Sequence, residues 1–569
     1  MESVRRTLPL LLVFVLAVSA CSNGSSDDTQ PTESGSAGSL EATLGLDGDH
    51  ALVGRLVIDT EAPSTPKVNV TGEERDFEIP VAQEGTHHEI PVAGLRAESA
   101  YTVVVADGTD EVSLELETSS LPDDFPEITI AAAETAAMSP GFTLFDLIDF
   151  TQPPTDEDGN PIPQPEPDEP PRAGLMVAVD NEGEVVWYHR ADHSIGDVRM
   201  LDDGTILHEY NDTAARRINL FGETIDEWAG QIIADELPTD DFGRQVVGDE
   251  AIVVPTDSMH HEVNQLSNGN IAVLSTELRT YDGFTEALCG DTEPGFENFE
   301  PFDGSYDLIS DIVTEFTPEG EIVFEAKLAD LLDPINDPRD QNVCGLPQGA
   351  VFPNWMYRAQ GFDQSRDWTH ANAVIEDPER NAFIVSIRHL DAVIAISRDT
   401  GELLWRLGPG GDFEMVGDGE FQFHQHAPEI QADGTLLLYD NGNFRPGTSF
   451  EFGSGLPFPT SRAVQYRIND DGPPDTWTVE QVWEYESRVD GSTAFAGFVG
   501  DADRLANGSV LITNGGYGED RDDDVTSQIV EVVPEGTDGG TEVFDLRMAN
   551  DRGWVIYRAE RVEDLYPAG

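Results

Sequence analysis

A repeated spacing constrains this 569-residue chain more than any other feature of its sequence. In five segments a histidine or glycine stands seven residues before an Asn or Asp that opens a turn, and an apolar run follows the turn. The segments begin at Gly196, His261, His370, His426 and Gly500. Equal offsets from equivalent turns give equal positions on equivalent strands. The pattern therefore predicts repeated β-hairpins that bring three imidazoles to one height.

A second repeat interleaves with the first. A strand, a tight turn and a strand ending in an aromatic residue recur six times, strictly or loosely. The hairpins are Asp180–Trp187, Phe221–Trp228, Thr317–Phe324, Arg398–Trp405, and looser forms at 471–483 and 535–544. This repetition favours a six-bladed β-propeller over residues 174–569, with residues 554–562 completing the sixth blade by pairing with the domain's first strands. A β-solenoid is the alternative, although its coils are shorter and more regular.

Residues 39–119 form a separate block of short alternating strands. Within it, Tyr101 follows a Gly-Leu turn, as does the tyrosine at the corner of a fibronectin type III sandwich. We therefore expect an Ig-like β-sandwich that acts as a spacer or as the surface of a homodimer. Residues 120–173 are expected to connect the two domains, because they contain an acidic, proline-rich stretch.

The N-terminus has the pattern of an export signal. Arg5 and Arg6 precede an apolar run that is too short to span a membrane, and the run ends in Ser-Ala before Cys21. Residues 1–20 are therefore predicted to be a lipoprotein signal peptide and 21–38 a flexible tether, with the mature protein lipid-anchored at Cys21 in the cell envelope. An ordinary secretory signal with a chance cysteine is the alternative.

Two further cysteines, Cys289 and Cys344, remain after the predicted cleavage. Thiols usually oxidise outside the cytosol, so a disulfide between them is the expected state. Catalytic thiol chemistry is correspondingly disfavoured.

The chain is strongly acidic, with 110 Asp and Glu against 31 Lys and Arg and a formal charge of −79. Such a surface repels nucleic acid and anionic membranes, so membrane contact is expected through the lipid anchor alone. Carboxylates spread over the whole length indicate a halophilic protein, because salt screens their repulsion. An anionic substrate would need a local cationic pocket, which directs attention to any inward-facing arginine.

In a propeller the innermost strand of each blade lines the central channel. The spacing therefore places His261, His370 and His426 in that channel. Asn372 lies two residues beyond His370, hence on the same face of the strand, and Arg388 lies on the strand that returns after the turn. A buried arginine pairs with a carboxylate or binds an anionic ligand. Glu277, at the equivalent position of the preceding repeat, is the candidate for an internal ion pair.

These residues carry a resemblance to a known family. Asp367-Trp-Thr-His-Ala-Asn372, Arg388 in Ser-Ile-Arg-His, Met259-His-His-Glu262, and His424-Gln-His426 with Tyr439-Asp-Asn-Gly442 are similar to the aryl-sulfate sulfotransferase family. The resemblance covers the propeller and the preceding sandwich. It implies that sulfuryl groups move from aryl sulfates to phenols in a ping-pong reaction, through a sulfated histidine and without a nucleotide or other cofactor.

By position, the resemblance implies that His426 is the nucleophile and His261 the general acid or base, whereas His370, Asn372 and Arg388 hold the sulfuryl oxygens. His260 and His424 lie close enough in sequence to exchange roles with these histidines. The family's active-site threonine has no clear equivalent, since Gly500 stands at the expected position and Thr513 is only a candidate. The aromatic residues that would bind a phenol also stay unassigned.

Two other functions are compatible with the same residues. Three converging histidines and a carboxylate also describe a metal site of the kind used by propeller lyases and hydrolases. Arg388 argues against it, because a cation beside a divalent ion is disfavoured. A non-catalytic propeller that binds a ligand or a partner protein is the second alternative, but it leaves the matched histidines unexplained.

Overall fold

The structure is a computed structural model. It describes residues 33–149, 174–237, 246–288, 304–343, 356–357, 360–362, 365–517, 525–549 and 554–566, apart from 49, 74, 212 and 452. The predicted lipidation site Cys21 and the predicted disulfide partners Cys289 and Cys344 lie outside the described residues. Across the part of the chain that is described, the helices are all too short or too polar to cross a membrane.

The N-terminal domain is the predicted β-sandwich, with two four-stranded antiparallel sheets packed on one apolar core. One sheet contains β1 (Glu33–Ala37), β2 (Leu40–Leu46), β3 (Gly54–Ser64) and β6 (Gly85–Val92), and the other β5 (Asp76–Ile79), β4 (Lys67–Thr71), β7 (Ala100–Asp107) and β8 (Asp110–Glu117). The backbone N–H of Arg96 donates to the Tyr101 hydroxyl at 2.9 Å, which is the corner contact expected of a fibronectin-like fold. Strand β1 begins inside the predicted tether, so the sandwich starts earlier than residue 39.

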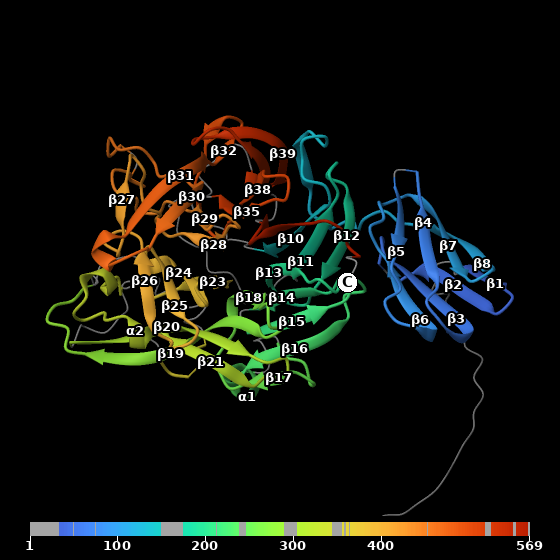
Figure 1. Ribbon diagram of the computed structural model, residues 1–569, viewed down its shortest axis with the longest axis horizontal. Helices are drawn as coiled ribbons and strands as arrows, with labels where there is room; N and C mark the ends of the chain where they lie inside the picture. Colours follow the sequence, from blue (N-terminus) through green and yellow to red (C-terminus); the bar gives the residue numbers. More distant parts are fainter. Residues whose placement is uncertain are drawn as a thin grey trace, which may run out of the picture.

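The rest of the described chain forms a ring of sheets, which Figure 1 shows beside the sandwich. The first three sheets are β12 (Val185–Arg190), β11 (Leu175–Val179) and β10 (Phe142–Asp149) with β40 (Trp554–Val555) and β41 (Ala559–Val562); β13 (Ile195–Met200), β14 (Ile206–Tyr210), β15 (Ala214–Ile218), β16 (Thr224–Gly230) and β17 (Ile252–Val254); and β18 (His260–Gln265), β19 (Ile271–Asp282), β20 (Ser305–Phe316), β21 (Ile322–Lys327) and β22 (Arg366–Asp367).

The next three sheets follow the same plan. They are β23 (Ala371–Asp377), β24 (Ala382–Ile387), β25 (Ala392–Ser397) and β26 (Leu403–Leu407); β28 (His426–Ile430), β29 (Thr435–Asp440), β30 (Arg462–Asn469), β31 (Thr478–Glu486) and β27 (Glu414–Val416); and β35 (Asp501–Arg504), β36 (Val510–Asn514), β38 (Val525–Pro534), β39 (Gly540–Ala549) and β9 (Ile128–Ala133). Smaller elements are the pairs β32 (Arg488–Val489) with β33 (Ser492–Thr493) and β34 (Ala496–Phe498) with β37 (Gly516–Tyr517), the helices α1 (Gln231–Glu236) and α2 (Leu328–Leu331), and the 3-10 turns Pro338–Asp340, Arg388–Leu390 and Pro474–Thr476.

The first strands of consecutive sheets contact one another in a closed circle. Contacts join β13 to β18, β18 to β23, β23 to β28 and β28 to β35, and β41 touches both β13 and β36. Figure 1 shows these strands around the middle of the ring, with the later strands of each sheet outside them. This arrangement is that of a β-propeller, so the predicted all-β fold, a propeller preceded by a β-sandwich, is confirmed.

The ring closes through strands from distant parts of the chain. Strand β41 pairs with β10 in antiparallel register, with Phe142 opposite Val562, and β9 pairs with β39. Both β9 and β10 lie in the stretch 120–173 that was predicted to be a connecting region. That prediction is wrong for these two strands. Strand β9 pairs with β39, and β10 pairs with β41 as well as with its neighbour β11, so part of their pairing joins segments from opposite ends of the chain that no local pattern reveals.

The aromatic residue that ends each outer hairpin has a structural role. The indole N–H of Trp187 donates to the carbonyl of Leu220 at 2.9 Å, in the turn of the next sheet. Trp228 bonds in the same way to Pro318 at 2.7 Å, and Trp483 to Gly539 at 3.0 Å. Three of the outer hairpins thus end in a tryptophan that bonds to the neighbouring sheet, whereas the indole N–H of Trp405 has no hydrogen-bond partner among the described residues.

Candidate active site

The innermost strands carry an irregularity at the same place. Register shifts occur within Gly196–Arg199 of β13, His260–Val263 of β18, Ala371–Ala373 of β23 and His426–Glu429 of β28. Such bulges bend a strand and redirect its side chains. The backbone is left-handed at His261, with φ 59°, and at His370, with φ 48°. Left-handed histidines are uncommon and concentrate at functional sites, where packing holds the strained conformation.

The three histidines of the sequence repeat lie in one buried cluster. The rings of His261 and His370 stand edge to face, with centroids 4.9 Å apart. His426 is 3% exposed, and it is close enough to His370 for that ring to lower the affinity of His426 for protons. The strands that carry His370 and His426 are in direct contact. The equal spacing in the sequence thus corresponds to equal positions around the channel.

His261 is oriented by its neighbour in the sequence. Its Nδ1 lies 2.7 Å from Nδ1 of His260, and Nε2 of His260 lies 3.2 Å from a carboxylate oxygen of Asp311. Because that oxygen accepts, His260 carries its proton on Nε2 and accepts at Nδ1 from the N–H of His261. The chain of hydrogen bonds therefore places the lone pair of His261 on Nε2, where the ring can act as a base.

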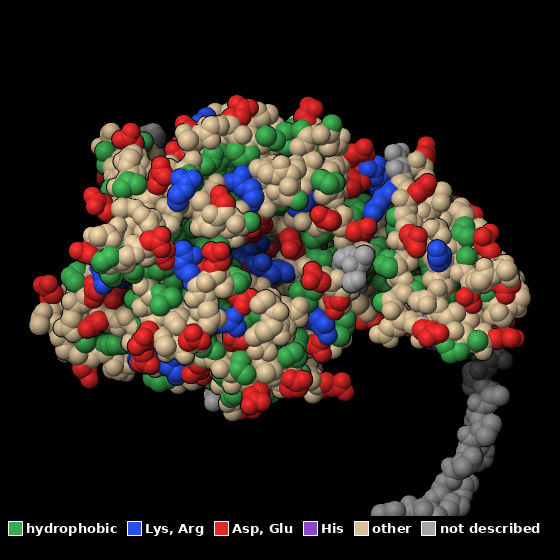
Figure 2. All heavy atoms as spheres, in the orientation of Figure 1, with side chains coloured by type: hydrophobic (Ala, Val, Ile, Leu, Met, Phe, Trp, Pro, Cys, Tyr) green, Lys and Arg blue, Asp and Glu red, His purple; other side chains and the backbone are tan. Residues whose placement is uncertain are grey.

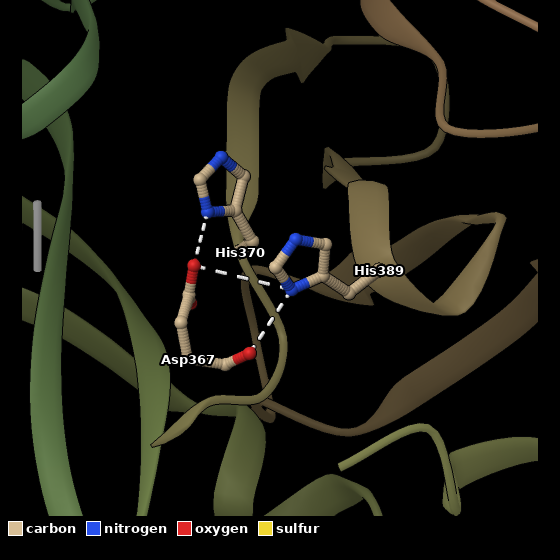
Figure 3. Close-up of side chains that lie close together, drawn as sticks. All are labelled: Asp367, His370 and His389. Atoms are coloured by element: carbon tan, nitrogen blue, oxygen red, sulfur yellow. Dashed lines mark hydrogen bonds and ion pairs between the residues drawn. The ribbon is translucent and has the colours of Figure 1, made fainter. Parts of the chain in front are cut away.

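His370 belongs to a group with Asp367 and His389, which Figure 3 shows. Nδ1 of His370 donates to the carboxylate of Asp367. The ring of His389 stacks on that of His370 at 4.6 Å, and its Nδ1 lies 3.0 Å from the backbone carbonyl of Asp367. Neutral His370 is thus an acceptor at Nε2. It becomes a donor to a substrate oxygen when it takes a proton, and Asp367 would stabilise the resulting imidazolium.

The same three residues have the spacing of a metal site, since one ligand atom from each lies within 4.8 Å of the others. Hydrogen bonds account for this spacing without an ion. Nδ1 of His370 is bonded to Asp367, and Nδ1 of His389 is bonded to a carbonyl. The neighbouring Arg388 lowers the affinity of both histidines for protons and would repel a divalent cation in the same way.

His426 is held by Asn441. Nδ1 of His426 lies 2.6 Å from Oδ1 of Asn441, whose Nδ2 donates to the carbonyls of Ala496 at 2.7 Å and Val499 at 2.8 Å. The two carbonyls require the amide nitrogen, so the amide oxygen faces His426 and accepts from its Nδ1–H. Nε2 of His426 therefore carries the lone pair that a nucleophile needs.

The imidazoles of His426, His261 and His370 are neutral at physiological pH. Burial, followed by the charge of Arg388, holds the pKa of His426 well below its usual range. Burial and the neighbouring rings of His370 and His260 do the same for the pKa of His261. Burial and Arg388 lower the pKa of His370 to about 3. An anion bound among them would raise these pKa values, because it favours the protonated rings.

Arg388 lies in the 3-10 turn that follows β24 and is buried beside the histidines. Its guanidinium donates to the carbonyl of Gly497 at 3.0 Å. No ion pair of Arg388 occurs among the described residues, and the alternative with Glu277 is wrong, because Glu277 binds Lys327 at 3.1 Å and Arg279 at 2.5 Å. Burial lowers the pKa of Arg388 to about 10, against the attraction of Asp367 and Asp391, so it is still a cation at neutral pH.

The remaining predicted residues take supporting positions. Asn372 is fully buried and donates from Nδ2 to the carbonyl of Gln425 at 2.8 Å, so it ties β23 to the start of the strand that carries His426. His424 donates from Nδ1 to Asp391 at 2.8 Å, and burial lowers its pKa to about 3. Thr513 is buried on β36 opposite Asp501, and its hydroxyl has no hydrogen-bond partner among the described residues.

A second arginine borders the cluster and is fully paired. Arg558 lies 2.8 Å from Asp197 and 2.7 Å from Glu262, and Arg199 binds the same two carboxylates. A cavity of about 250 Å³ adjoins this network, and Figure 2 shows Lys and Arg side chains gathered in the hollow middle of the ring. The cavity is lined by Asp197, Val198, Arg199, Glu429, Asp501, Asp503, Arg504, Leu505, Arg558, Ala559, Glu560 and Arg561.

Sequence reasoning missed the residues that orient the histidines. Asp367, His389 and Asn441 stand inside the quoted motifs but had no assigned role, whereas Asp311 and Arg558 had not been considered. Asp367 precedes His370 by three residues, and this spacing was a usable signal. Asn441 lies 15 residues after His426, just past the strand β29 that pairs with β28. Arg558 reaches the site from the far end of the chain, so the sequence gives no local indication of its contacts.

The chain is similar in sequence to one family and to two curated relatives. The sequence model of the arylsulfotransferase (ASST) family matches residues 134–292 and 294–558. The arylsulfate sulfotransferases AssT of Escherichia coli and Lelliottia amnigena are 27% and 25% identical over 234 residues, which are 34% of this chain and 37% of each relative. The chain thus aligns with just over a third of these relatives' length. A crystal structure of a Bacteroides caccae protein of unknown function matches with TM-score 0.38 and 13% identity, over 74% of this chain and 98% of the other.

Proposed function

Because the chain belongs to the arylsulfotransferase family, we propose that it transfers a sulfuryl group from an aryl sulfate to a phenol through a sulfated His426. One observation carries the proposal. A neutral imidazole with its lone pair fixed on Nε2 lies beside a buried guanidinium that has no ion pair among the described residues. Such a pair suits nucleophilic attack on an anionic group, since the cation offsets the charge that the nucleophile must approach.

In the first half-reaction, the Nε2 lone pair of His426 attacks sulfur and the bond from sulfur to the aryl oxygen breaks. The electron pair leaves with the phenolate. Arg388 donates to the sulfuryl oxygens. His370 joins it after taking a proton from the solvent, because the bound anion raises the pKa of this ring and Asp367 provides the counter-charge. The product is a labile N–S bond on His426.

In the second half-reaction, the oxygen of a phenol attacks the same sulfur and the electron pair of the N–S bond returns to Nε2. His261 takes the phenol proton, because its hydrogen bond to His260 leaves the lone pair on Nε2. The same proton is available to the departing phenolate of the next turnover. His261 thus alternates between base and acid, and the kinetics are ping-pong.

The test is mass spectrometry of the protein after incubation with 4-nitrophenyl sulfate in high salt. We expect an acid-labile adduct of about 80 Da, one SO₃, on the peptide that contains His426. His426→Ala should lose both the adduct and transfer to phenol. His424→Ala is the matched control, because it removes a neighbouring histidine and should keep the adduct. An adduct on His424, or none on the wild-type protein, would contradict the proposal.

We also propose that the protein is exported and lipid-anchored at Cys21, in line with its N-terminal sequence. Expression with Cys21→Ser should release the protein from the membrane fraction into the soluble fraction. Release of the wild-type protein under the same conditions would contradict the anchor.

A further inference from the structure

An exposed group of phenylalanines lies beside the proposed site. Phe444, Phe450 and Phe458 come from the connection between β29 and β30, and Phe495 from the segment before β34. The first three are 69%, 42% and 47% exposed. Their rings form a continuous series, with centroid distances of 5.5 Å from Phe444 to Phe450 and 5.3 Å from Phe450 to both Phe458 and Phe495. We call these four residues the aromatic shelf.

The aromatic shelf is connected to the proposed site at two points. The ring of Phe444 stands edge to face with that of His424 at 5.3 Å, and the rings of His424 and His389 are 6.1 Å apart. At the other point, Gly497 accepts the hydrogen bond of Arg388. A Cβ on Gly497 would lie 2.9 Å from the ring of Phe495, so this glycine is packed directly against the shelf. Gly497 thus lies between the guanidinium of Arg388 and the ring of Phe495, so the aromatic shelf is adjacent to the proposed sulfuryl-binding arginine.

The stability of the fold does not explain why the rings of the aromatic shelf are exposed. Exposed aromatic rings in a contiguous group are uncommon on soluble proteins and usually mark a binding surface. Phe444 also has a left-handed backbone with φ 57°, which is costly for a bulky residue. This backbone conformation places the ring of Phe444 against His424, at the edge of the proposed site.

We propose that the aromatic shelf binds the part of an acceptor beyond its reacting ring, which makes phenols with two or more aromatic rings the favoured acceptors. The inference rests on the proposed function. With the hydroxyl of an acceptor directed at His426 and His261 and its first ring toward Arg388, a second ring would extend toward Phe495 and Phe450. Stacked and edge-to-face contacts among aromatic rings add affinity without needing charge, which suits a neutral phenol on this acidic protein.

The test compares two acceptors of similar acidity, phenol and 4-phenylphenol, with 4-nitrophenyl sulfate as the donor. We expect kcat/KM for 4-phenylphenol to exceed that for phenol, and Phe450→Ala with Phe458→Ala to reduce the ratio of the two at least tenfold, while kcat/KM for phenol stays unchanged. Phe450→Leu with Phe458→Leu keeps the apolar surface and should lose the part of the preference that needs rings. Leu404→Ala, on the outermost strand β26 and 40% exposed, is the control and should change neither value.

Equal losses for both acceptors, or a wild-type protein that does not prefer 4-phenylphenol, would overturn the inference. Binding of 4-phenylphenol by calorimetry provides a readout that does not need turnover. If the wild-type protein forms no adduct and transfers nothing, the proposed function fails. Weaker binding to the double alanine variant than to the wild-type protein would then still support the shelf, and equal binding would overturn it.

Discussion

Two buried arginines border the same histidines, and they differ in what surrounds them. Arg558 contacts Asp197 and Glu262, which outweigh the effect of burial and raise its pKa. Arg388 has a carbonyl as its partner, and burial lowers its pKa to about 10. A paired cation holds strands together, whereas a cation without a counter-ion has a charge to offer to a ligand. The comparison separates the structural part of the channel from the proposed reactive part.

The largest expected effect is the loss of stability in Arg558→Met. Removing this guanidinium leaves Asp197 and Glu262 buried with less compensation, which should cost about 3–5 kcal/mol of the free energy of unfolding. Denaturation in guanidinium chloride measures it. Adding Glu262→Gln to Arg558→Met should restore part of the stability. Unchanged stability in Arg558→Met would mean that the network does not hold the ring.

Arg388→Met should have the opposite profile. Loss of a preorganised donor to the sulfuryl oxygens should reduce kcat/KM by about 10²–10³-fold. The midpoint of unfolding should stay the same or rise, because an apolar side chain replaces a buried charge without an ion pair. Steady-state kinetics and thermal unfolding on one preparation test both parts. Full activity, or a large loss of stability, would mean that Arg388 stabilises the fold, as Arg558 does, and does not bind the sulfuryl group.

The pH profile sharpens the comparison further. Burial and Arg388 hold the pKa of His426 well below its usual range, so the nucleophile stays neutral and the acid limb of kcat/KM should lie well below pH 6.5. Arg388→Met removes the cation with the larger influence and should move this limb to higher pH. Arg558→Met should move it less, because Arg558 has the smaller influence on His426. An equal displacement in both variants would argue against the assignment.

The smallest expected effect is that of a chelator. Treatment with EDTA followed by desalting should leave kcat/KM unchanged, because hydrogen bonds account for the group of Asp367, His370 and His389. If EDTA abolished activity and added zinc restored it, the group of Asp367, His370 and His389 would be a metal site instead.

Much of the fold followed from the repeats, for identifiable reasons. The spacing before each turn located the innermost strands, and the aromatic endings located the outer hairpins, because both features depend on local sequence. Strands β9 and β10 escaped, since each pairs with a segment from the far end of the chain. Strand β1 was not predicted because its sequence is rich in Ser and Gly and resembles a tether.

The positions of the site histidines could be predicted from the sequence, whereas their hydrogen-bond partners could not. His261, His370 and His426 share a position in the repeat, so their convergence could be derived from the sequence. The proton positions could not, because they depend on which side chain faces each ring: Asn441 of the segment after β29 faces His426, and Asp311 of β20 faces His260. The ion pair suggested between Arg388 and Glu277 is wrong because Glu277 binds two cations of its own sheet, Arg279 and Lys327.

The pairing of β41 with β10 has a consequence for synthesis and turnover. Arg558 and the closing strand are among the last described residues to leave the ribosome, whereas all three repeat histidines emerge well before them. A product that ends before Trp554 would contain His261, His370 and His426 but would lack strand β41, which closes the ring. It would also lack Arg558, the cation that neutralises Asp197 and Glu262. Such fragments would hold the three histidines without the closed ring around them, so we expect them to lack the proposed sulfuryl transfer.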